Sequence, residues 1–207
     1  MTPLLAFDIE TVPDIAGLRV LNDIDPSFGD AEVAEFAFRE RRAQSGQDFL
    51  PLHLHRVVAI ACALREGEGF RCWSLGSAAD VEADLIRRFF DGIEKYAPQL
   101  VSWNGKGFDM PVLHYRGLVH GIAAPRYWDL GEEDKDFRYN NYLSRYHARH
   151  LDLMDLLAIS AAQQRPARPA LAARRLSHHP RQRDRHHHRS DDGGVLMVRR
   201  QPMGDQP

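Results

Sequence analysis

Hydrophobic and polar positions along the first 157 residues predict a mixed sheet flanked by helices. Short apolar runs that end in charges or turn residues predict five strands: Leu4–Ile9, Val57–Leu64, Phe70–Leu75, Leu100–Trp103 and His150–Leu157, the last of which could also be a strand running into a helix. Three helices are predicted: Ala31–Ser45 from its content of Ala, Glu, Arg and Phe, Val81–Tyr96 from apolar residues at helical spacing, and Phe108–His120 from the preceding turn and from Pro111 in its first turn. Strands followed by helices alternating with strands indicate an α/β fold.

The composition changes abruptly near residue 158. Residues 158–207 contain no Phe, Trp, Tyr, Lys or Glu, and they carry ten arginines against four aspartates, a net charge of +6. Residues 1–157 carry 17 basic and 25 acidic side chains, a net charge of −8. Such a tail buries too little apolar surface to offset the entropy of ordering it. We therefore expect a folded domain over residues 1–158 and a mostly unfolded tail over residues 159–207.

The whole-chain composition excludes several protein classes. The net charge of −2 gives no global basic field that would indicate a nucleic-acid partner, and 43% hydrophobic residues are too many for a fully disordered chain. No apolar run is long enough to span a membrane, and the N-terminus lacks the basic region of a secretory signal. Two cysteines cannot build a disulfide framework. We expect a cytoplasmic protein without a membrane partner.

Two carboxylates lie at the end of the first predicted strand. Because side chains alternate along a strand, Asp8 and Glu10 share one face, and Ile9 points to the other. Carboxylates beside an apolar strand are costly to bury unless a positive partner is present, and Mg²⁺ and Mn²⁺ prefer such oxygen ligands. The alternative is a strand that runs out into a polar loop, with both acids solvated.

A second acidic position follows the fourth predicted strand. Residues 104–107, Asn-Gly-Lys-Gly, form a turn, and Asp109 then stands in the first turn of a helix, where the helix dipole favours an acid. Local stabilisation of the helix is therefore an alternative to a functional role for Asp109. Asn104 could bridge the turn or contact a substrate, and Phe108 could pack in the core or present its ring.

Together these segments resemble the DEDD-type 3′–5′ exonucleases, which have an RNase H-like fold. The closest resemblance is to the stand-alone branch that is similar to the proofreading domain of family B DNA polymerases, and it covers about residues 1–158. The residues that carry it are Phe7-Asp8-Ile9-Glu10-Thr11, the segment from Asn104 through Phe108-Asp109 to Pro111, and His150-Leu151-Asp152-Leu153-Met154-Asp155-Leu156-Leu157.

The resemblance implies a two-metal phosphodiester hydrolysis at 3′ ends of single-stranded DNA or RNA. In that picture two Mg²⁺ or Mn²⁺ ions bind the scissile phosphate and activate a water. Asp8, Glu10 and Asp109 are the implied catalytic residues and metal ligands, and Asp152 is a further candidate ligand. The residues expected to contact nucleic acid are Thr11, Asn104 and Phe108.

The sequence departs from the family pattern after residue 158. The family has a fourth acid on a C-terminal helix, within Y-x-x-x-D or H-x-x-x-x-D, and no tyrosine follows Tyr146. The spacing from His186 to Asp191 matches the second pattern. Because the tail is rich in both His and Asp, we attribute this match to chance. We therefore expect the C-terminal helices of the fold to be missing and activity to be low or absent.

A one-base shift of the reading frame near codon 158 would explain this departure. One codon choice for residues 159–169, read one base out of frame, encodes YQPRNNAPLD, which is similar to the family's own continuation. The nucleotide sequence tests this hypothesis, since it requires a shifted frame that encodes a Y-x-x-x-D helix.

Two other functions remain open at this stage. The chain could be a non-catalytic nucleic-acid-binding remnant of the enzyme, or a structural or interaction module that uses the same fold. The segment of residues 124–149 interleaves aromatic rings with arginines, a pattern that fits either stacking on bases or packing against the sheet.

Overall fold

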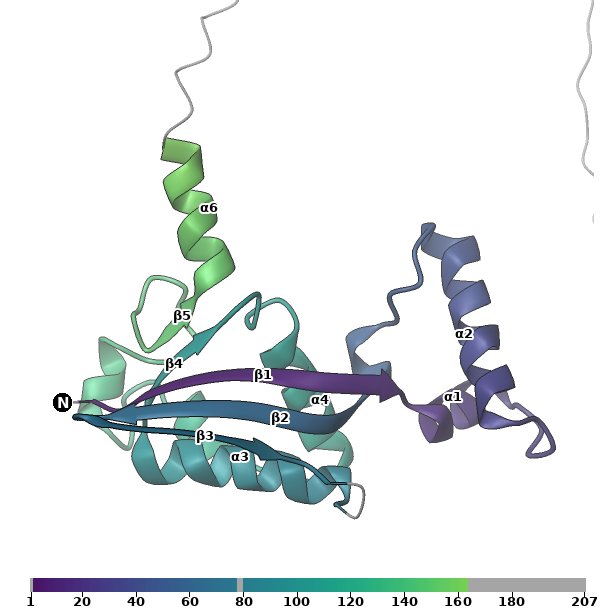
Figure 1. The fold of residues 1–207 in the computed structure, drawn as a ribbon, viewed down its shortest axis with the longest axis horizontal. Helices are drawn as coiled ribbons and strands as arrows, with labels where there is room; N and C mark the ends of the chain where they lie inside the picture. The colour runs from purple at the N-terminus through teal and green to yellow at the C-terminus, as the bar shows by residue number, and fades with distance from the viewer. Residues whose placement is uncertain (1, 78–79, 164–207) are drawn as a thin grey trace, which may run out of the picture. The chain divides into compact units, whose positions relative to one another are not determined.

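A five-stranded mixed sheet forms the centre of the protein in the computed structural model, which describes residues 2–77 and 80–163 (Figure 1). The strands lie in the order β3-β2-β1-β4-β5, with β1, β2 and β3 antiparallel and with β4 and β5 parallel to β1. Their bounds are β1 Leu4–Pro13, β2 His55–Glu66, β3 Gly69–Leu75, β4 Gln99–Ser102 and β5 His150–Asp152. The α/β class and all five predicted strands are therefore confirmed.

Helices flank this sheet and connect its strands. The long ones among the described residues are α2 Asp30–Ser45, α3 Glu82–Tyr96, α4 Asp109–Val119 and α6 Leu153–Gln163, and the shorter ones are α1 Ile15–Asn22 and α5 Pro125–Trp128, with 3₁₀ turns at Leu52–Leu54 and Lys135–Arg138. The three predicted helices correspond to α2, α3 and α4. None of the described helices is long and apolar enough to cross a membrane.

The main core lies between one face of the sheet and the helices α3 and α4. Leu5, Phe7 and Ile9 of β1 are buried on this face, whereas Asp8 and Glu10 on the other face are exposed. The α3 side chains that complete the core recur at helical spacing: Leu85, Ile86, Phe89, Phe90 and Ile93. The alternation along β1 thus decides which side chains face the helices and which remain available on the open face.

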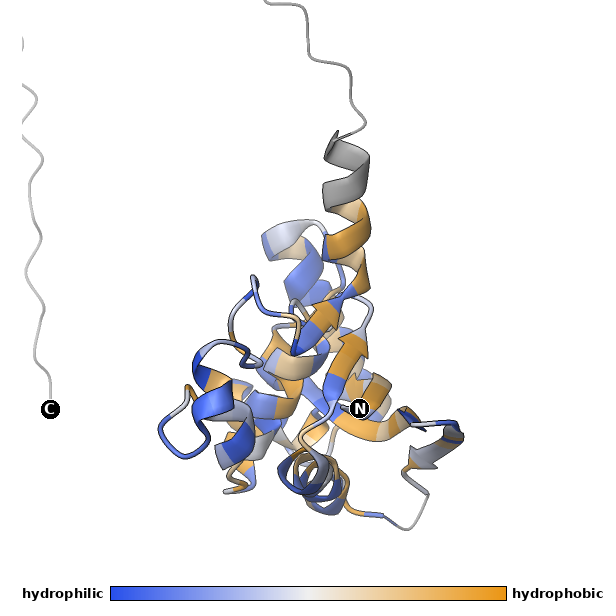
Figure 2. Ribbon diagram, turned by 90° about the vertical axis from the view of Figure 1, so that its left-hand side faces the viewer, coloured by the Kyte–Doolittle hydropathy of each residue, from blue (hydrophilic) through white to orange (hydrophobic). Residues whose placement is uncertain are grey.

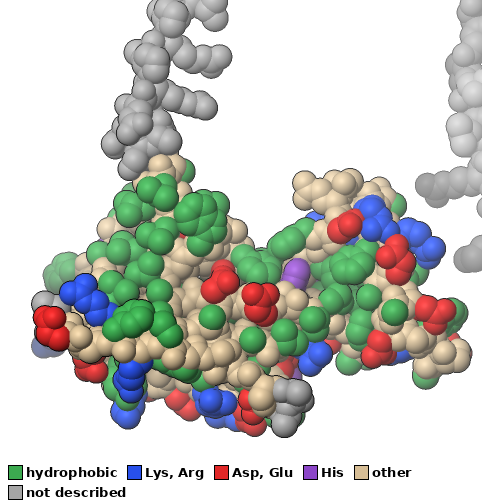
Figure 3. Space-filling view, in the orientation of Figure 1, with side chains coloured by type: hydrophobic (Ala, Val, Ile, Leu, Met, Phe, Trp, Pro, Cys, Tyr) green, Lys and Arg blue, Asp and Glu red, His purple; other side chains and the backbone are tan. Residues whose placement is uncertain are grey.

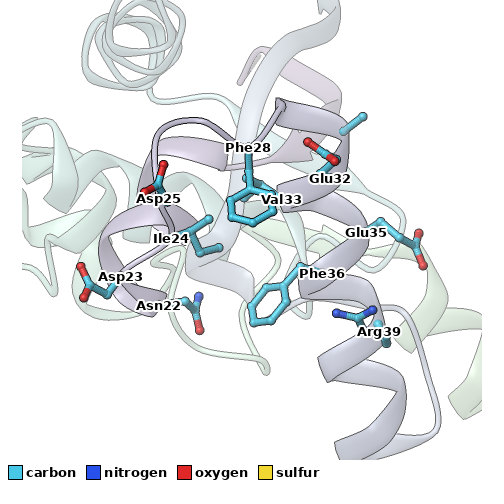
Figure 4. A pocket seen from close by; sticks show the side chains of 11 residues that line it. Asn22, Asp23, Ile24, Asp25, Phe28, Glu32, Val33, Glu35, Phe36 and Arg39 are labelled. Carbon is cyan, nitrogen blue, oxygen red and sulfur yellow. The ribbon is translucent and has the colours of Figure 1, made fainter.

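A second, smaller core joins α1 and α2. Its buried members are Leu18, Val33, Ala37, Leu50 and Leu54. An open cavity of about 790 Å³ lies between α2 and the connection that follows α1, with Ile24, Phe28 and Phe36 among its apolar lining residues (Figure 4).

The structure differs from the sequence-based expectations at three places. β1 continues to Pro13, because its residues still pair with β2 beyond an irregularity at Glu10/Thr11. Helix α1 was not expected, and it begins after Asp14, whose side chain accepts a hydrogen bond from the backbone of Gly17. The last expected strand shortens to β5 and continues directly as α6.

Helix α6 begins before residue 158, the expected end of the folded domain, and extends to Gln163. The start of α6 is hydrophobic (Figure 2). Its exposed hydrophobic side chains are Leu153, Met154, Leu156 and Leu157. The expectations for residues 164–207, including the unfolded tail and the spacing of His186 and Asp191, lie outside the described residues.

The aromatic and basic segment of residues 124–149 packs mainly as structure. Phe137 and Tyr142 are almost fully buried, and the guanidinium of Arg149 lies 4.3 Å from the centre of the Phe137 ring. Tyr139 and Tyr146, by contrast, are among the most exposed aromatic side chains of the described residues. Packing against the sheet therefore accounts for the inner rings and their arginines.

A buried ion cluster fixes the ends of β1, α3 and α4 to one another. Arg116 of α4 donates to Asp14 Oδ2 at 2.5 Å and to both oxygens of Glu82, at 2.8 and 2.6 Å. Glu82 also accepts from the backbone N–H of Val57, and all three charged side chains are buried. Because each charge has several hydrogen-bonded partners, the cluster offsets the cost of removing it from water.

Replacing Arg116 with Met should lower the free energy of unfolding by about 3–5 kcal/mol, because two buried carboxylates would lose their cation. Urea unfolding measures this loss. Arg42→Met is the matched control, since Arg42 also pairs with two carboxylates, but in an exposed cluster. The control should lose less than about 1 kcal/mol, and equal losses in both variants would contradict a special role for the buried cluster.

Candidate active site

The two carboxylates of β1 lie on the open face of the sheet, in a stretch of the strand that no longer pairs with β4. Pairing between β1 and β4 ends at Ala6 and Val101, so the edge of β1 beyond Ala6 has no strand on that side. Asp8 and Glu10 follow within this stretch and are exposed. Figure 3 shows two acidic side chains, a histidine and several hydrophobic side chains close together on the face that β1 presents. The acids are thus accessible from solvent.

Asp109 fills the gap beside β1. Its Oδ1 accepts a hydrogen bond from the backbone N–H of Ile9 at 3.1 Å, and the residue is only 2% exposed. The start of α4 is thereby fixed to the residue that separates Asp8 from Glu10. The sequence predicts that these three acids belong to one site, and the structure brings Asp109 to the backbone between the other two.

Burial and neighbouring charge raise the pKa of Asp109 to about 6. Desolvation is the largest cause, the negative charge of Asp8 adds to it, and Asp152 contributes a smaller repulsion. The hydrogen bond from Ile9 acts in the opposite direction. A bound cation would relieve the same repulsion, so the electrostatics of Asp8 and Asp109 fit a divalent ion.

The turn before Asp109 has a fixed and crowded backbone. Asn104 has a positive φ of 58°, and its carbonyl accepts hydrogen bonds from the N–H groups of Gly107 and Phe108, each at 2.9 Å. A Cβ atom at Gly105 would lie 2.1 Å from Ser102 Oγ, so only glycine fits there. The turn therefore delivers Phe108 and Asp109 to β1 in one conformation.

Asp152 holds this turn from the end of β5. Its Oδ1 accepts from the N–H groups of Asn104 and Met154, at 2.9 and 3.1 Å, and its Oδ2 accepts from the N–H of Lys106 at 3.0 Å. The residue is 5% exposed. Both carboxylate oxygens are thus used by backbone donors, an arrangement that suits an anchor for the turn better than the metal ligand predicted from sequence.

Three aromatic rings contact one another beside the carboxylates. The ring centre of His55 lies 5.0 Å from that of Phe49 and 5.2 Å from that of Phe108, and the two phenylalanine ring centres lie 5.6 Å apart. Thr11 Oγ1 lies 3.0 Å from His55 Nδ1. Thr11 and Phe108 were expected near the site. Phe49 and His55 were not, because they belong to a connecting segment and a strand end with no recognisable motif around them.

The candidate metal ligands do not form a closed cage. Within the described part of the chain, no three His, Cys, Asp or Glu side chains are gathered so as to hold a metal ion. Asp8 and Glu10 lie on one strand face, and Asp109 reaches the strand from its edge. All three offer carboxylate oxygens, the donor type that Mg²⁺ and Mn²⁺ prefer. The donor chemistry therefore fits these ions.

The raised pKa of Asp109 gives a testable pH dependence. Between about pH 4 and pH 6 the folded protein holds a proton that the unfolded chain has released, so ionisation of Asp109 removes stability as the pH rises. Ionisation of Asp109 should lower the free energy of unfolding of the wild type by on the order of 2–3 kcal/mol. Asp109→Asn keeps an oxygen for the Ile9 N–H but cannot ionise, so it should not show this decrease. Urea unfolding in EDTA at several pH values measures it. If the difference in free energy of unfolding between the variant and the wild type stayed constant from pH 4 to pH 7, the raised pKa would not belong to Asp109.

Comparisons with known proteins agree with the resemblance seen in the sequence. A family model described as a predicted 3′–5′ exonuclease related to the exonuclease domain of PolB matches residues 47–174. This match includes the turn, Asp109 and Asp152, and it begins after β1. A search of curated proteins found no match.

One similar solved structure is the family B DNA polymerase from the hyperthermophilic archaeon Pyrobaculum calidifontis. The similarity covers 76% of this chain and 16% of the polymerase chain, with 19% sequence identity and a TM-score of 0.42. The chain thus spans only a small part of that polymerase. Because the family model matches more than half of the sequence, the chain belongs to the family of predicted 3′–5′ exonucleases related to the exonuclease domain of PolB.

Proposed function

We propose that this protein is a metal-dependent exonuclease that removes nucleotides from the 3′ ends of single-stranded DNA or RNA. Membership of the exonuclease family supports the reaction class. The observation that carries the proposal is the hydrogen bond between Asp109 and the N–H of Ile9, because it fixes a third acid to the backbone between Asp8 and Glu10. The products would be nucleoside 5′-monophosphates.

Asp8, Glu10 and Asp109 are the proposed ligands of two Mg²⁺ or Mn²⁺ ions. When bound, such a pair supplies an activated water and stabilises the leaving 3′ oxygen. The negative charge of Asp8 raises the pKa of Asp109, and we assign Asp8 as the ligand that both ions would share. Glu10, exposed on the same strand face, is assigned to accept a hydrogen bond from the attacking water and orient it. Asp109 holds its place through Ile9.

The turn and its neighbours are assigned to the substrate. Asn104 and Phe108 flank the hydrogen-bonded backbone of the turn, and Thr11 follows Glu10 directly. Asp152 acts on the substrate only through the turn, because its oxygens accept the N–H groups of Asn104 and Lys106. We therefore assign Asp152 a positioning role.

A non-catalytic nucleic-acid-binding remnant is the second candidate function. It is favoured by one specific observation, the sequence of α6, which contains no tyrosine and no acid after Asp155. Among the residues that the structure describes, Asp155 forms an ion pair with Arg145 at 3.9 Å, near the protein surface. The described residues thus do not supply the fourth acid that the family pattern includes.

Cleavage of labelled single strands separates these functions. With Mg²⁺ or Mn²⁺, a 3′-labelled oligonucleotide should release labelled mononucleotide, and a 5′-labelled one should shorten stepwise. Asp8→Ala should reduce release to the level seen in EDTA, because the proposed shared ligand is lost, while thermal unfolding shows an intact fold. DNA and RNA strands are assayed in parallel to identify the substrate.

Asp91→Ala is the matched control, since Asp91 is an exposed aspartate on α3 outside the proposed site. It should cleave like the wild type. Binding without metal-dependent cleavage would favour the remnant and overturn the enzymatic proposal. Neither binding nor cleavage would favour a structural module, and retained cleavage in Asp8→Ala would overturn the site assignment.

A further inference from the structure

We infer that the cavity between α2 and the connection that follows α1 binds a basic amphipathic helix of a partner protein. The centre of the cavity is apolar, because Ile24 and the rings of Phe28 and Phe36 lie in the middle of its lining (Figure 4). Phe28 is 51% exposed although it is a large hydrophobic side chain. The proposed exonuclease reaction does not use this surface, so the inference stands independently of that reaction.

The cavity continues the small core that joins α1 and α2. Val33 is fully buried in that core and also lines the cavity, and Ile24 packs against the core from the connection. Apolar side chains of a partner that enter the cavity would therefore extend an existing core. Burial of apolar surface is the main favourable contribution to protein association.

The lining follows one face of α2 for about two turns. Ala31, Glu35 and Arg39 lie four residues apart along this face, and Glu32 and Phe36 form a second row beside them. Two such rows leave a groove into which the side chains of another helix can pack. The face is about 12 Å long, at 1.5 Å per residue, which matches two turns of a bound helix.

Acidic side chains surround the apolar centre. Among the described residues that line the cavity are one base, Arg39, and four acids, namely Asp23, Asp25, Glu32 and Glu35. In Figure 4 the charged groups lie around the edge of the labelled set and the apolar side chains lie inside it. Lysines or arginines beside the apolar stripe of a partner helix would complement these acids. The same acids repel nucleic-acid phosphates, so the charge favours a basic protein segment.

The connection that forms one wall of the cavity is held by local hydrogen bonds. Asp25 accepts from the backbone N–H of Ser27 at 2.7 Å, and hydrogen bonds from Ser27 lower the pKa of Asp25. Arg19 donates to the carbonyl of Phe28 at 2.6 Å and pairs with Asp30 at the start of α2. A wall that is already ordered loses little conformational entropy when a partner binds, which favours recognition.

A fluorescein-labelled peptide tests the cavity in the full chain. The peptide has about 14 residues, with Leu at helical spacing and Lys on both flanks of the Leu stripe. It should bind the wild type, as measured by fluorescence anisotropy, and added salt should weaken binding. A peptide with Glu in place of each Lys should not bind, and neither should a scrambled peptide without an apolar face.

Phe28→Ala should weaken binding of the basic peptide about 5- to 30-fold, because a central apolar contact is lost. Phe28→Leu should restore most of the binding, since it returns an apolar side chain. Phe70→Ala is the matched control, because Phe70 is an exposed ring on β3, outside the cavity. It should bind the peptide like the wild type, and thermal unfolding shows whether each variant is folded.

Neutralising two acids of the cavity tests the charge. Asp23→Asn combined with Glu35→Gln should weaken binding about 2- to 10-fold at low salt and reduce its salt dependence. Asn suits position 23, where φ is 50°. Glu68→Gln combined with Asp91→Asn is the control, since it removes two exposed acids outside the cavity. This control should bind the peptide like the wild type.

Several results would overturn the inference. They include equal binding of the basic peptide by the wild type and Phe28→Ala, binding of the acidic peptide as tight as that of the basic one, and no binding of the basic peptide. If Phe28→Ala instead weakened binding of a labelled oligonucleotide, the cavity would serve nucleic acid. If Phe28→Ala abolished a wild-type dimer seen by sedimentation, a second copy of the chain would occupy the cavity. Either result also overturns the inference.

Discussion

The unpaired edge of β1 is the constraint on which the site depends. After Ala6 the strand has no parallel neighbour, so the N–H of Ile9 would lack a partner beside the core. A buried N–H without a partner costs about as much as a lost hydrogen bond. The carboxylate of Asp109 satisfies it. One requirement of sheet geometry thus brings the first residue of α4 to the residue between two exposed acids.

Hydrogen bonds from other elements hold α4 in this position. Asp152 at the end of β5 fixes the turn, and the turn fixes the start of α4. At the other end of α4, Arg116 joins the helix to Asp14 and Glu82. Both ends of α4 are therefore held by charged side chains from other elements, while its apolar side packs in the core. The helix can place Asp109 reproducibly because little of it is free to shift.

The strands of the sheet could be predicted because the alternation of side chains along a strand depends only on neighbouring residues in the sequence. Alternation places Phe7 and Ile9 opposite Asp8 and Glu10 in any strand of this sequence. The contacts that distinguish the roles of the polar residues are not local. Arg116 lies 34 residues from Glu82 and 102 from Asp14, and no helical pattern indicates that an arginine near the end of α4 is buried.

The same limit explains what the sequence missed in the candidate site. An aspartate after an apolar strand has the same pattern whether it binds a metal or accepts backbone N–H groups, so Asp152 could not be assigned from sequence. Phe49 belongs to a connection without periodicity, and its contact with Phe108 joins residues that are 59 positions apart in the sequence. Asp8, Glu10 and Asp109, by contrast, are predicted as one group because their motifs are specific in combination.

Asp14 serves two purposes at once, since it caps α1 through Gly17 and neutralises Arg116. If α1 were to detach, Arg116 would lose one of its two carboxylate partners, and the N-terminal turn of α1 would lose its cap. Detachment of the helical pair α1 and α2 is thereby coupled to damage inside the main core. The segment that carries Phe49 consequently shares the cooperativity of the sheet, and its amide protons should exchange at rates closer to global opening than to fraying of a surface appendage.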